Sequence, residues 1–325
     1  MFFSKDGVVR VDISTEKIPD FLSDQTGVLW VDFHGEKEDV AEPILSDMFG
    51  FHPLSIDDAL QQSHVPRVDD WQEYLYIVLH GLSFKINPEM TMDTQELDIF
   101  LGKNFLITLH DDKIASLEKL WKSCCRDQRM TKRGPDYLLH NLIDLIVSDY
   151  MPIIDDLDEV LDEIEDSILN NPKPTVVDKI FGSKRVLLLL RRIVAHQRET
   201  LNKLARDDYP VVSKEAKVYF RDVYDQLVRM YDITDGMRDL VSGALDTYLS
   251  VINNRMNEIM KTLTIITTVF MPLSFVTGFF GMNFFQPIEA TMSVWTGRLA
   301  FIVMFASMVL VPVSMILWMK RRGWF

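Results

Sequence analysis

The sequence predicts a membrane protein that has an α/β N-terminal cytoplasmic domain, long cytoplasmic helices, and a two-helix transmembrane hairpin at the C-terminus. Three observations lead to this prediction. Two uncharged apolar stretches follow one another near the end of the 325-residue chain. Helical spacing of apolar residues runs from Tyr137 to the first of these stretches. Short strand-like runs, in contrast, are confined to the residues before Tyr137.

Charge is distributed very unequally along the chain. Residues 261–325 carry five basic side chains and one acidic one, a net charge of +4, whereas residues 1–260 carry 29 basic and 47 acidic side chains, a net charge of −18. This balance argues against a nucleic-acid binder, because such proteins present a basic face to the phosphate backbone. It also argues against an ordinary soluble enzyme and favours a large acidic aqueous part joined to a membrane-embedded tail.

Each uncharged stretch is long enough to cross a bilayer as a helix, which takes about 20 apolar residues. The first lies between Lys261 and Glu289, and the second lies between Arg298 and Lys320. The alternative is a buried helix pair in a soluble protein. Two such segments in tandem at the end of the chain, however, leave no further layer to bury them. We therefore expect two transmembrane helices.

Flanking charge and cysteine usage predict the orientation of these spans. Three basic residues, 320–322, follow the second span, and Arg255 and Lys261 flank the start of the first. By the positive-inside rule, both termini are expected in the cytoplasm. The adjacent Cys124 and Cys125 offer neither a structural disulfide nor a spaced metal motif, and the N-terminus has no apolar signal segment. Both features agree with a protein of the cell (inner) membrane whose large N-terminal part lies in the cytoplasm.

The aqueous part divides into two regions. Residues 1–145 are expected to form the α/β domain, with strands at 28–33, 74–79, 97–100 and 105–109 and helices at 38–49 and 55–62. Residues 146–256 are expected to form long helices, interrupted at Pro172 and Pro174 and again at Pro210. A continuous helix over 214–280 would be about 100 Å long. The first span is thus predicted to be the end of a long cytoplasmic helix.

An acidic run on one of these helices has two interpretations. Its eight carboxylates crowd one another at spacings of three and four residues. They either form a solvated face or collect divalent cations, which favour oxygen ligands. The spacing does not distinguish the two. The residues are Asp155, Asp156, Asp158, Glu159, Asp162, Glu163, Glu165 and Asp166.

The chain contains no motif that indicates an enzyme. It has no G-x-G-x-x-G, P-loop, G-x-S-x-G or H-E-x-x-H sequence. Its seven histidines are scattered along residues 34–196, so His and Cys ligation of zinc is unsupported. We therefore expect a protein without catalytic residues.

The first span carries an uncharged stripe of polar, small and methionine residues at alternating steps of three and four. Such a stripe is suited either to close helix packing or to lining a pore. A single hairpin cannot enclose water, so a pore requires a ring of subunits. The stripe consists of Asn257, Met260, Leu263 or its neighbour Thr264, Thr267, Met271, Ser274 and Gly278, and it leads to Gly281, Met282 and Asn283.

The segment 261–283, with its Met-Pro-Leu run and its closing Gly-Met-Asn, resembles the first transmembrane segment and signature of the CorA family of divalent-cation (Mg²⁺/Co²⁺) channels. Its position directly after the first of two C-terminal spans makes the match specific. The resemblance continues upstream at 137–144, 219–225 and 238–243 and is weakest in the N-terminal domain. It implies a pore helix at 257–283, an extracytoplasmic loop at 284–297, a second span at 298–319 and a basic tail at 320–325.

The resemblance further implies a funnel-shaped homopentamer embedded in membrane lipid that conducts Mg²⁺, and often Co²⁺ or Ni²⁺, down the electrochemical gradient. Gly281, Met282 and Asn283 would form the selectivity filter. Mg²⁺ sheds water reluctantly, so a ring of neutral Asn283 carbonyls can accept hydrogen bonds from its bound waters without stripping them. The apolar members of the stripe would form constrictions, and the polar members would form steps compatible with water.

The family also senses cytosolic Mg²⁺ at acidic sites between subunits. Asp222 matches one such position, and the candidates for its partner in the N-terminal domain are Asp93 and Glu96. Bound Mg²⁺ would screen the repulsion between acidic bodies and hold the ring closed.

One segment departs from the family pattern. The outer loop places an acid at Glu289, one position later than in many relatives, which puts its attraction for cations in doubt. Two other functions stay open. One is a Zn²⁺ or proton-coupled transporter on the same scaffold, and the other is a membrane-anchored acidic sensor. Only the sensor would tolerate leucine in place of the polar residues of the stripe.

Overall fold

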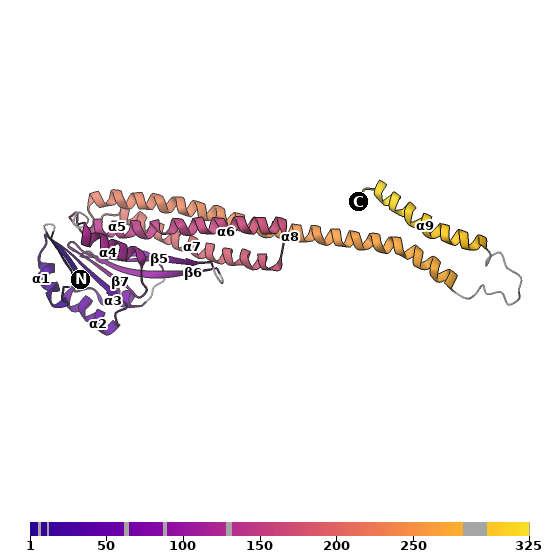
Figure 1. The fold of residues 1–325 in the computed structure, drawn as a ribbon. Coiled ribbons are helices and arrows are strands. Elements are labelled where there is room, and N and C mark those ends of the chain that lie inside the picture. The colour runs from indigo at the N-terminus through magenta and orange to yellow at the C-terminus, as the bar shows by residue number, and fades with distance from the viewer. Residues whose placement is uncertain are drawn as a thin grey trace. The chain divides into compact units, whose positions relative to one another are not determined.

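The computed structural model describes residues 1–5, 8–11, 13–61, 65–86, 90–127, 132–281 and 298–324 (Figure 1). These residues form two compact units, Met1–Asp246 and Thr247–Phe325. The first unit contains a sheet and most of the helices, and the second contains two apolar helical segments.

A seven-stranded sheet organises the first unit. Its strand order is β2-β1-β3-β7-β6-β5-β4, and only the central pair β3 and β7 is parallel. The strands are β1 (Phe2–Lys5), β2 (Val8–Val11), β3 (Val28–His34), β4 (Arg67–Asp70), β5 (Leu75–Lys85), β6 (Thr91–Leu101) and β7 (Phe105–His110).

The predicted strands are present, and the structure adds three more. β5 continues six residues beyond its predicted end at Leu79, because its pairing with β6 runs from Leu75 opposite Leu101 to Lys85 opposite Thr91. The strands β1, β2 and β4 are only four residues long and contain charged or polar side chains. Such short runs carry little periodic signal, so neighbouring strands are needed to define them.

Helices cover both faces of the sheet (Figure 1). One face packs against α1 (Ile18–Ser23), α2 (Glu38–Pro43), a π-helical turn (Ile44–Met48) and α3 (Pro53–Leu60), which follow a 3₁₀ turn (Thr15–Lys17). The helix predicted at 38–49 is therefore divided at Pro43. The helix predicted at 55–62 begins two residues earlier, with proline in its first turn, and ends at Leu60, whereas Gln62 lies outside the described residues.

The other face of the sheet packs against α4 (Ala115–Arg126), α5 (Pro135–Ser148) and α7 (Pro174–Arg206). Because side chains alternate along a strand, Leu29 and Val31 face the first helical layer while Trp30 faces the second. Trp30 packs there against Trp121 of α4, with ring centroids 4.9 Å apart. The result is a three-layer α/β/α unit.

The proline interruptions fall where the sequence predicts them. The helix α6 (Tyr150–Asn170) ends before Pro172, α7 begins at Pro174, and α8 (Lys214–Gly281) begins after Pro210. The buried residues of α6 recur at helical spacing, and its eight clustered carboxylates are all exposed. In this chain the acidic run therefore forms a solvent-facing surface.

The second unit leaves its apolar side chains uncovered. Among the described residues, two helices are long and apolar enough to cross a membrane: the C-terminal part of α8, and α9 (Arg298–Arg321). Phe275 of α8 is 73 % exposed, and Phe270 and Met271 are similarly uncovered. Aromatic and apolar surface of this extent favours contact with lipid or with further protein.

The end of α9 is capped by backbone hydrogen bonds. Trp324 N–H donates to the carbonyl of Met319 and Gly323 N–H donates to that of Lys320, at 3.1 and 3.2 Å. Gly323 has φ +75°, the left-handed conformation that this cap requires and that glycine adopts without steric cost. The three basic residues at this end therefore belong to an ordered helix terminus.

Candidate functional site

The predicted pore face lies along the C-terminal half of α8. From Asn257 to Gly281 the structure is one unbroken helix, and every stripe residue on it is exposed. The side chains of Thr267, Met271 and Ser274 are thus not buried by the rest of this chain. Met282 and Asn283, the other two residues of the predicted filter, lie outside the described residues.

The hydroxyl groups of this segment bond back to their own helix. Thr267 Oγ1 donates to the carbonyl of Leu263 at 2.9 Å, and Thr264 Oγ1 donates to that of Met260 at 2.7 Å. A hydroxyl whose hydrogen is used in this way presents only acceptor lone pairs to its other side. This arrangement suits the water molecules around a cation, which donate hydrogen bonds outward, and it also suits helix packing.

Asp222 lies on the first part of α8, where α8 packs beside α5. It accepts a hydrogen bond from Gln226 Nε2 at 3.3 Å, and the same amide donates to Asp144 of α5 at 3.4 Å. His140 of α5 completes the cluster. Burial lowers the pKa of His140, and the negative charges of Asp144 and Asp222 oppose this shift. Two carboxylates therefore share one amide beside a largely neutral imidazole.

The two candidate partners of Asp222 lie on β6. Asp93 is exposed and pairs in register with Ser83, whereas the side chain of Glu96 is only 8 % exposed and lies 3.8 Å from His80 Nε2. Among the described residues, no group of three or more His, Cys, Asp or Glu side chains is arranged to hold a metal ion. A single chain does not assemble the predicted regulatory site, and the intersubunit site stays a prediction.

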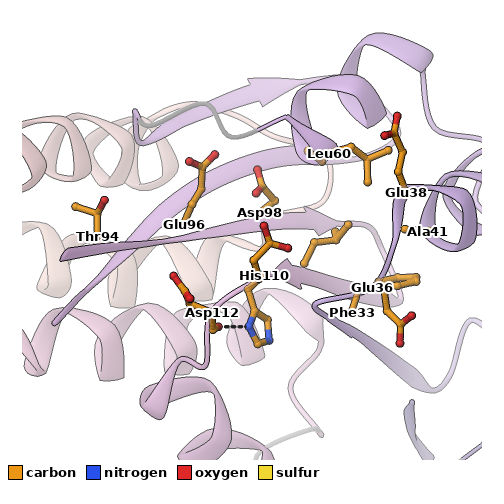
Figure 2. A pocket seen from close by; sticks show the side chains of 13 residues that line it. Phe33, Glu36, Glu38, Ala41, Leu60, Thr94, Glu96, Asp98, His110 and Asp112 are labelled. Carbon is orange, nitrogen blue, oxygen red and sulfur yellow. Dashed lines mark hydrogen bonds between the residues drawn. The ribbon is translucent and has the colours of Figure 1, made fainter.

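Glu96 also borders an acidic pocket of about 140 Å³ between the sheet and the α2–α3 layer (Figure 2). Its wall carries six carboxylates and His110. The carboxylates are those of Glu36, Glu38, Glu96, Asp98, Asp111 and Asp112. Sequence reasoning did not predict this cluster, because its residues come from three segments that are far apart along the chain, 36–38, 96–98 and 110–112.

His110 is held at the edge of this pocket. Its Nδ1 lies 2.6 Å from the carbonyl oxygen of Asp112, as the dashed line in Figure 2 shows, and its Nε2 lies 3.3 Å from Asp32. Burial disfavours the imidazolium, but the interactions with Asp32 and with the Asp112 carbonyl outweigh burial and raise the pKa of His110.

Asp98 is the buried member of the pocket, with 6 % of its surface exposed. Burial raises its pKa well above the ordinary value of 3.8, and the negative charge of Glu96 adds to this effect. Tyr76 donates a hydrogen bond of 2.5 Å to Asp98 Oδ1. One sequence signal could have found this residue: Asp98 interrupts an apolar strand on the same face as Phe100, which is fully buried.

Replacing Asp98 with asparagine is expected to stabilise the first unit at neutral pH. A raised pKa means that the folded protein holds a proton which the unfolded chain releases above pH 3.8, so the stabilisation by wild-type Asp98 is complete below that value and is lost as the pH rises. Each pKa unit is worth about 1.4 kcal/mol. Asparagine does not ionise, so it avoids this loss, and its side-chain carbonyl can still accept the hydrogen bond from the Tyr76 hydroxyl.

Thermal unfolding of the full chain in detergent, followed across pH 4 to 8 by near-ultraviolet circular dichroism, checks this prediction. The advantage of Asp98→Asn should grow with pH and vanish in acid. Asp93→Asn, on the same strand but exposed, is the control and should change little. A less stable Asp98→Asn protein at neutral pH would show instead that the carboxylate is ionised and partnered there.

Comparison of the chain and its structure with known proteins identifies its family. Residues 25–321 match the family model described as CorA-like Mg²⁺ transporter protein. The chain is 34 % identical over 304 residues to the cobalt/magnesium transport protein CorA of Thermotoga maritima, covering 93 % of this chain and 84 % of that one. The structure of the CorA magnesium transporter from Methanocaldococcus jannaschii superposes with a TM-score of 0.81 at 26 % identity, covering 100 % of this chain and 98 % of that one. The zinc transport protein ZntB of Yersinia pseudotuberculosis is 22 % identical over 81 % of this chain and 78 % of its own. The chain therefore belongs to the CorA-like Mg²⁺ transporter family and shares its α/β domain, its long helix and its two C-terminal apolar helices.

Proposed function

We propose that this protein is a homopentameric channel that conducts Mg²⁺, and also Co²⁺ or Ni²⁺, into the cytoplasm down the electrochemical gradient. The observation that supports this most is the unbroken helix α8, which carries an uncharged polar and methionine face from Asn257 to Gly281. This face leads directly into the Gly-Met-Asn sequence. The named Mg²⁺ and Co²⁺ relatives identify the class of ion.

The chemistry of the filter follows from Mg²⁺ hydration. The ion prefers octahedral oxygen geometry and keeps several waters. Five Asn283 carbonyls at the mouth would accept hydrogen bonds from these waters, and release stays fast because no carboxylate holds the ion. An inside-negative potential supplies the drive, about 4.6 kcal/mol for two charges per 100 mV. The basic residues 320–322 favour cytoplasmic termini.

The exposed stripe supports assembly into a ring. A lone hairpin encloses no water, but five copies of α8 that present Asn257, Thr267 and Ser274 inward would form a wetted path. Met260, Leu263 and Met271 would narrow that path at points where it can gate by dewetting, and Gly278 would leave it wide near the mouth.

Cytosolic Mg²⁺ is proposed to close the channel at sites between subunits that contain Asp222. Asp93 is favoured over Glu96 as the partner, because Asp93 is exposed whereas Glu96 is turned toward His80 and the acidic pocket. A neighbouring subunit can reach Asp93 without rearranging the first unit. Bound Mg²⁺ would offset the repulsion between two acidic bodies.

Replacing Thr267 with leucine is expected to lower Mg²⁺ flux strongly, because it turns a water-compatible step into a fourth apolar ring. A barrier higher by about 1.4 kcal/mol lowers flux about tenfold. Thr262→Leu is the matched control. Its hydroxyl makes the same bond, to the carbonyl of Glu258 at 2.9 Å, but at 3.6 residues per turn it lies on the opposite side of α8.

Uptake of Mg²⁺ into proteoliposomes under an inside-negative potential tests both the function and the pore face. Flux in the wild type and in Thr262→Leu, with loss in Thr267→Leu, is the expected result. Equal flux in all three proteins would remove the pore assignment. If the assembled protein moves Zn²⁺ in a pH gradient but not Mg²⁺, it resembles the zinc relative in function. If the assembled protein moves neither ion, the membrane-anchored sensor is the function that remains.

A further inference from the structure

A second cavity in the first unit has basic walls. Its volume is about 570 Å³, and it lies where the starts of β3 and β7 meet the start of α5. Four cationic side chains line it, those of Lys5, Lys103, Lys132 and Arg133. None of the described lining residues is acidic, although residues 1–260 as a whole carry a net charge of −18.

Two of these cations remain available for a ligand. Lys5 is engaged by Asp24 at 2.6 Å, an ion pair that lowers the pKa of Asp24 to about 2. Lys103 and Lys132 are both exposed, and within the described part of the chain neither takes part in an ion pair. Among the described residues, Lys5 is therefore the only one of the four cations that is paired with a carboxylate.

One buried carboxylate directly follows the lining residues Gly134 and Pro135 in the sequence. Asp136, in the first turn of α5, is buried and accepts hydrogen bonds from the backbone N–H and the hydroxyl of Ser213, at 2.9 and 2.6 Å. It also accepts from the backbone N–H of Tyr137 at 2.8 Å. These donors occupy both carboxylate oxygens of Asp136, and within the described part of the chain no ion pair joins it to a cation of the cavity wall.

Arg133 is held in a fixed orientation. Its guanidinium lies 4.7 Å from the ring centroid of Tyr137, and its Nη1 donates to Tyr219 Oη at 3.0 Å. A guanidinium has five N–H donors in a planar fork, so this single bond leaves donors for a second acceptor. Such a fork matches the oxygen geometry of a phosphate group.

We propose that this cavity binds a phosphate-bearing small molecule, held by Arg133, Lys103 and Lys132. Gln25 and Thr26 supply neutral polar groups to the same wall. The volume falls within the roughly 300–1,000 Å³ that is usual for small-molecule sites, which admits either inorganic phosphate or a nucleotide.

Arg133 also connects the cavity to the helix that carries Asp222. Its partner Tyr219 lies one turn before Asp222 on α8, and the Tyr219 ring lies 5.2 Å from that of His140. Ligand bound at Arg133 would bias the packing of α5 against α8 and so change the response to cytosolic Mg²⁺. This regulatory part rests on the proposed channel function, whereas the binding part does not.

Titration calorimetry on the full-length protein in detergent tests the binding part, with inorganic phosphate and ATP as separate probes in Mg²⁺-free buffer. Saturable binding that Lys103→Gln/Lys132→Gln weakens about tenfold or more is expected, because this double variant removes two charge-assisted hydrogen bonds to the anion. The control is Lys17→Gln/Lys37→Gln, two exposed lysines elsewhere in the unit, which should bind as the wild type does.

The outcomes of this titration distinguish phosphate from ATP as the ligand, and an anion site from a subunit contact. Binding of both probes, or of ATP alone, supports the site and identifies the size of its ligand. No saturable binding, or equal weakening in both double variants, overturns it. Loss of the oligomer in the cavity variant without any anion binding would also overturn it, in favour of contact with an acidic neighbouring subunit.

Tyr219→Phe tests the regulatory part, because it removes the bond to Arg133 without changing charge. Whichever of the two probes binds in calorimetry, when placed inside proteoliposomes at matched free Mg²⁺, is expected to shift the internal Mg²⁺ dependence of uptake in the wild type but not in this variant. An unchanged dependence in the wild type would contradict the regulation while leaving the binding result standing. If no Mg²⁺ flux occurs at all, the channel proposal fails and calorimetry still decides the site.

Discussion

Asn283→Ala is expected to abolish Mg²⁺ uptake while the oligomer stays assembled. In a pentamer the change removes five amide carbonyls at once from the proposed mouth. The methyl groups that replace them cannot accept hydrogen bonds from the waters of the ion, and Mg²⁺ gives up those waters reluctantly. Uptake into proteoliposomes under an inside-negative potential measures the loss, and size-exclusion chromatography measures the assembly.

Asn254→Ala is the matched control for this experiment. Asn254 is exposed on α8 and precedes the polar stripe; at 3.6 residues per turn it lies about 60° around the helix from Asn257 and about 120° from the middle of the stripe, so its loss should leave uptake unchanged. Normal uptake by an assembled Asn283→Ala protein would remove the filter assignment. If both variants lose uptake and the oligomer together, the asparagines act in assembly.

Asp222→Lys is expected to weaken the inhibition of uptake by internal Mg²⁺. The change replaces a proposed cation ligand with a cation, so the closed ring loses its Mg²⁺-dependent advantage. Coupling free energies between sites are typically about 1–3 kcal/mol, which corresponds to a roughly 5- to 150-fold higher internal Mg²⁺ concentration at half-inhibition. Uptake measured against a series of internal Mg²⁺ concentrations gives this value.

Asp178→Lys makes the same change of charge on the exposed surface of α7 and should leave the inhibition curve in place. Asp93→Asn and Glu96→Gln then identify the partner, and the exposure of Asp93 predicts that it has the larger effect. An inhibition curve that Asp222→Lys does not move would contradict the regulatory assignment. Equal shifts in Asp222→Lys and Asp178→Lys would indicate an effect of net charge alone.

The sequence by itself determined the features that local patterns encode. Uncharged runs identify the two spans, since charge is costly in a bilayer. Proline ends helices, so the boundaries around Pro172, Pro174 and Pro210 were predictable. Short apolar runs bounded by turn residues identified the cores of β3, β5, β6 and β7. The stripe on α8 was visible for the same reason, because residues three and four apart share a helix face.

Only the tertiary structure decided which distant side chains meet. Asp98 joins Glu36 and Glu38 in the acidic pocket, and Arg133 reaches Tyr219 across 86 residues of sequence. Such contacts depend on how sheet and helices stack, and they have no period along the chain. The short strands β1 and β2 form for the same reason, because pairing of β1 with β3 and of β2 with β1 stabilises them where their own propensity does not.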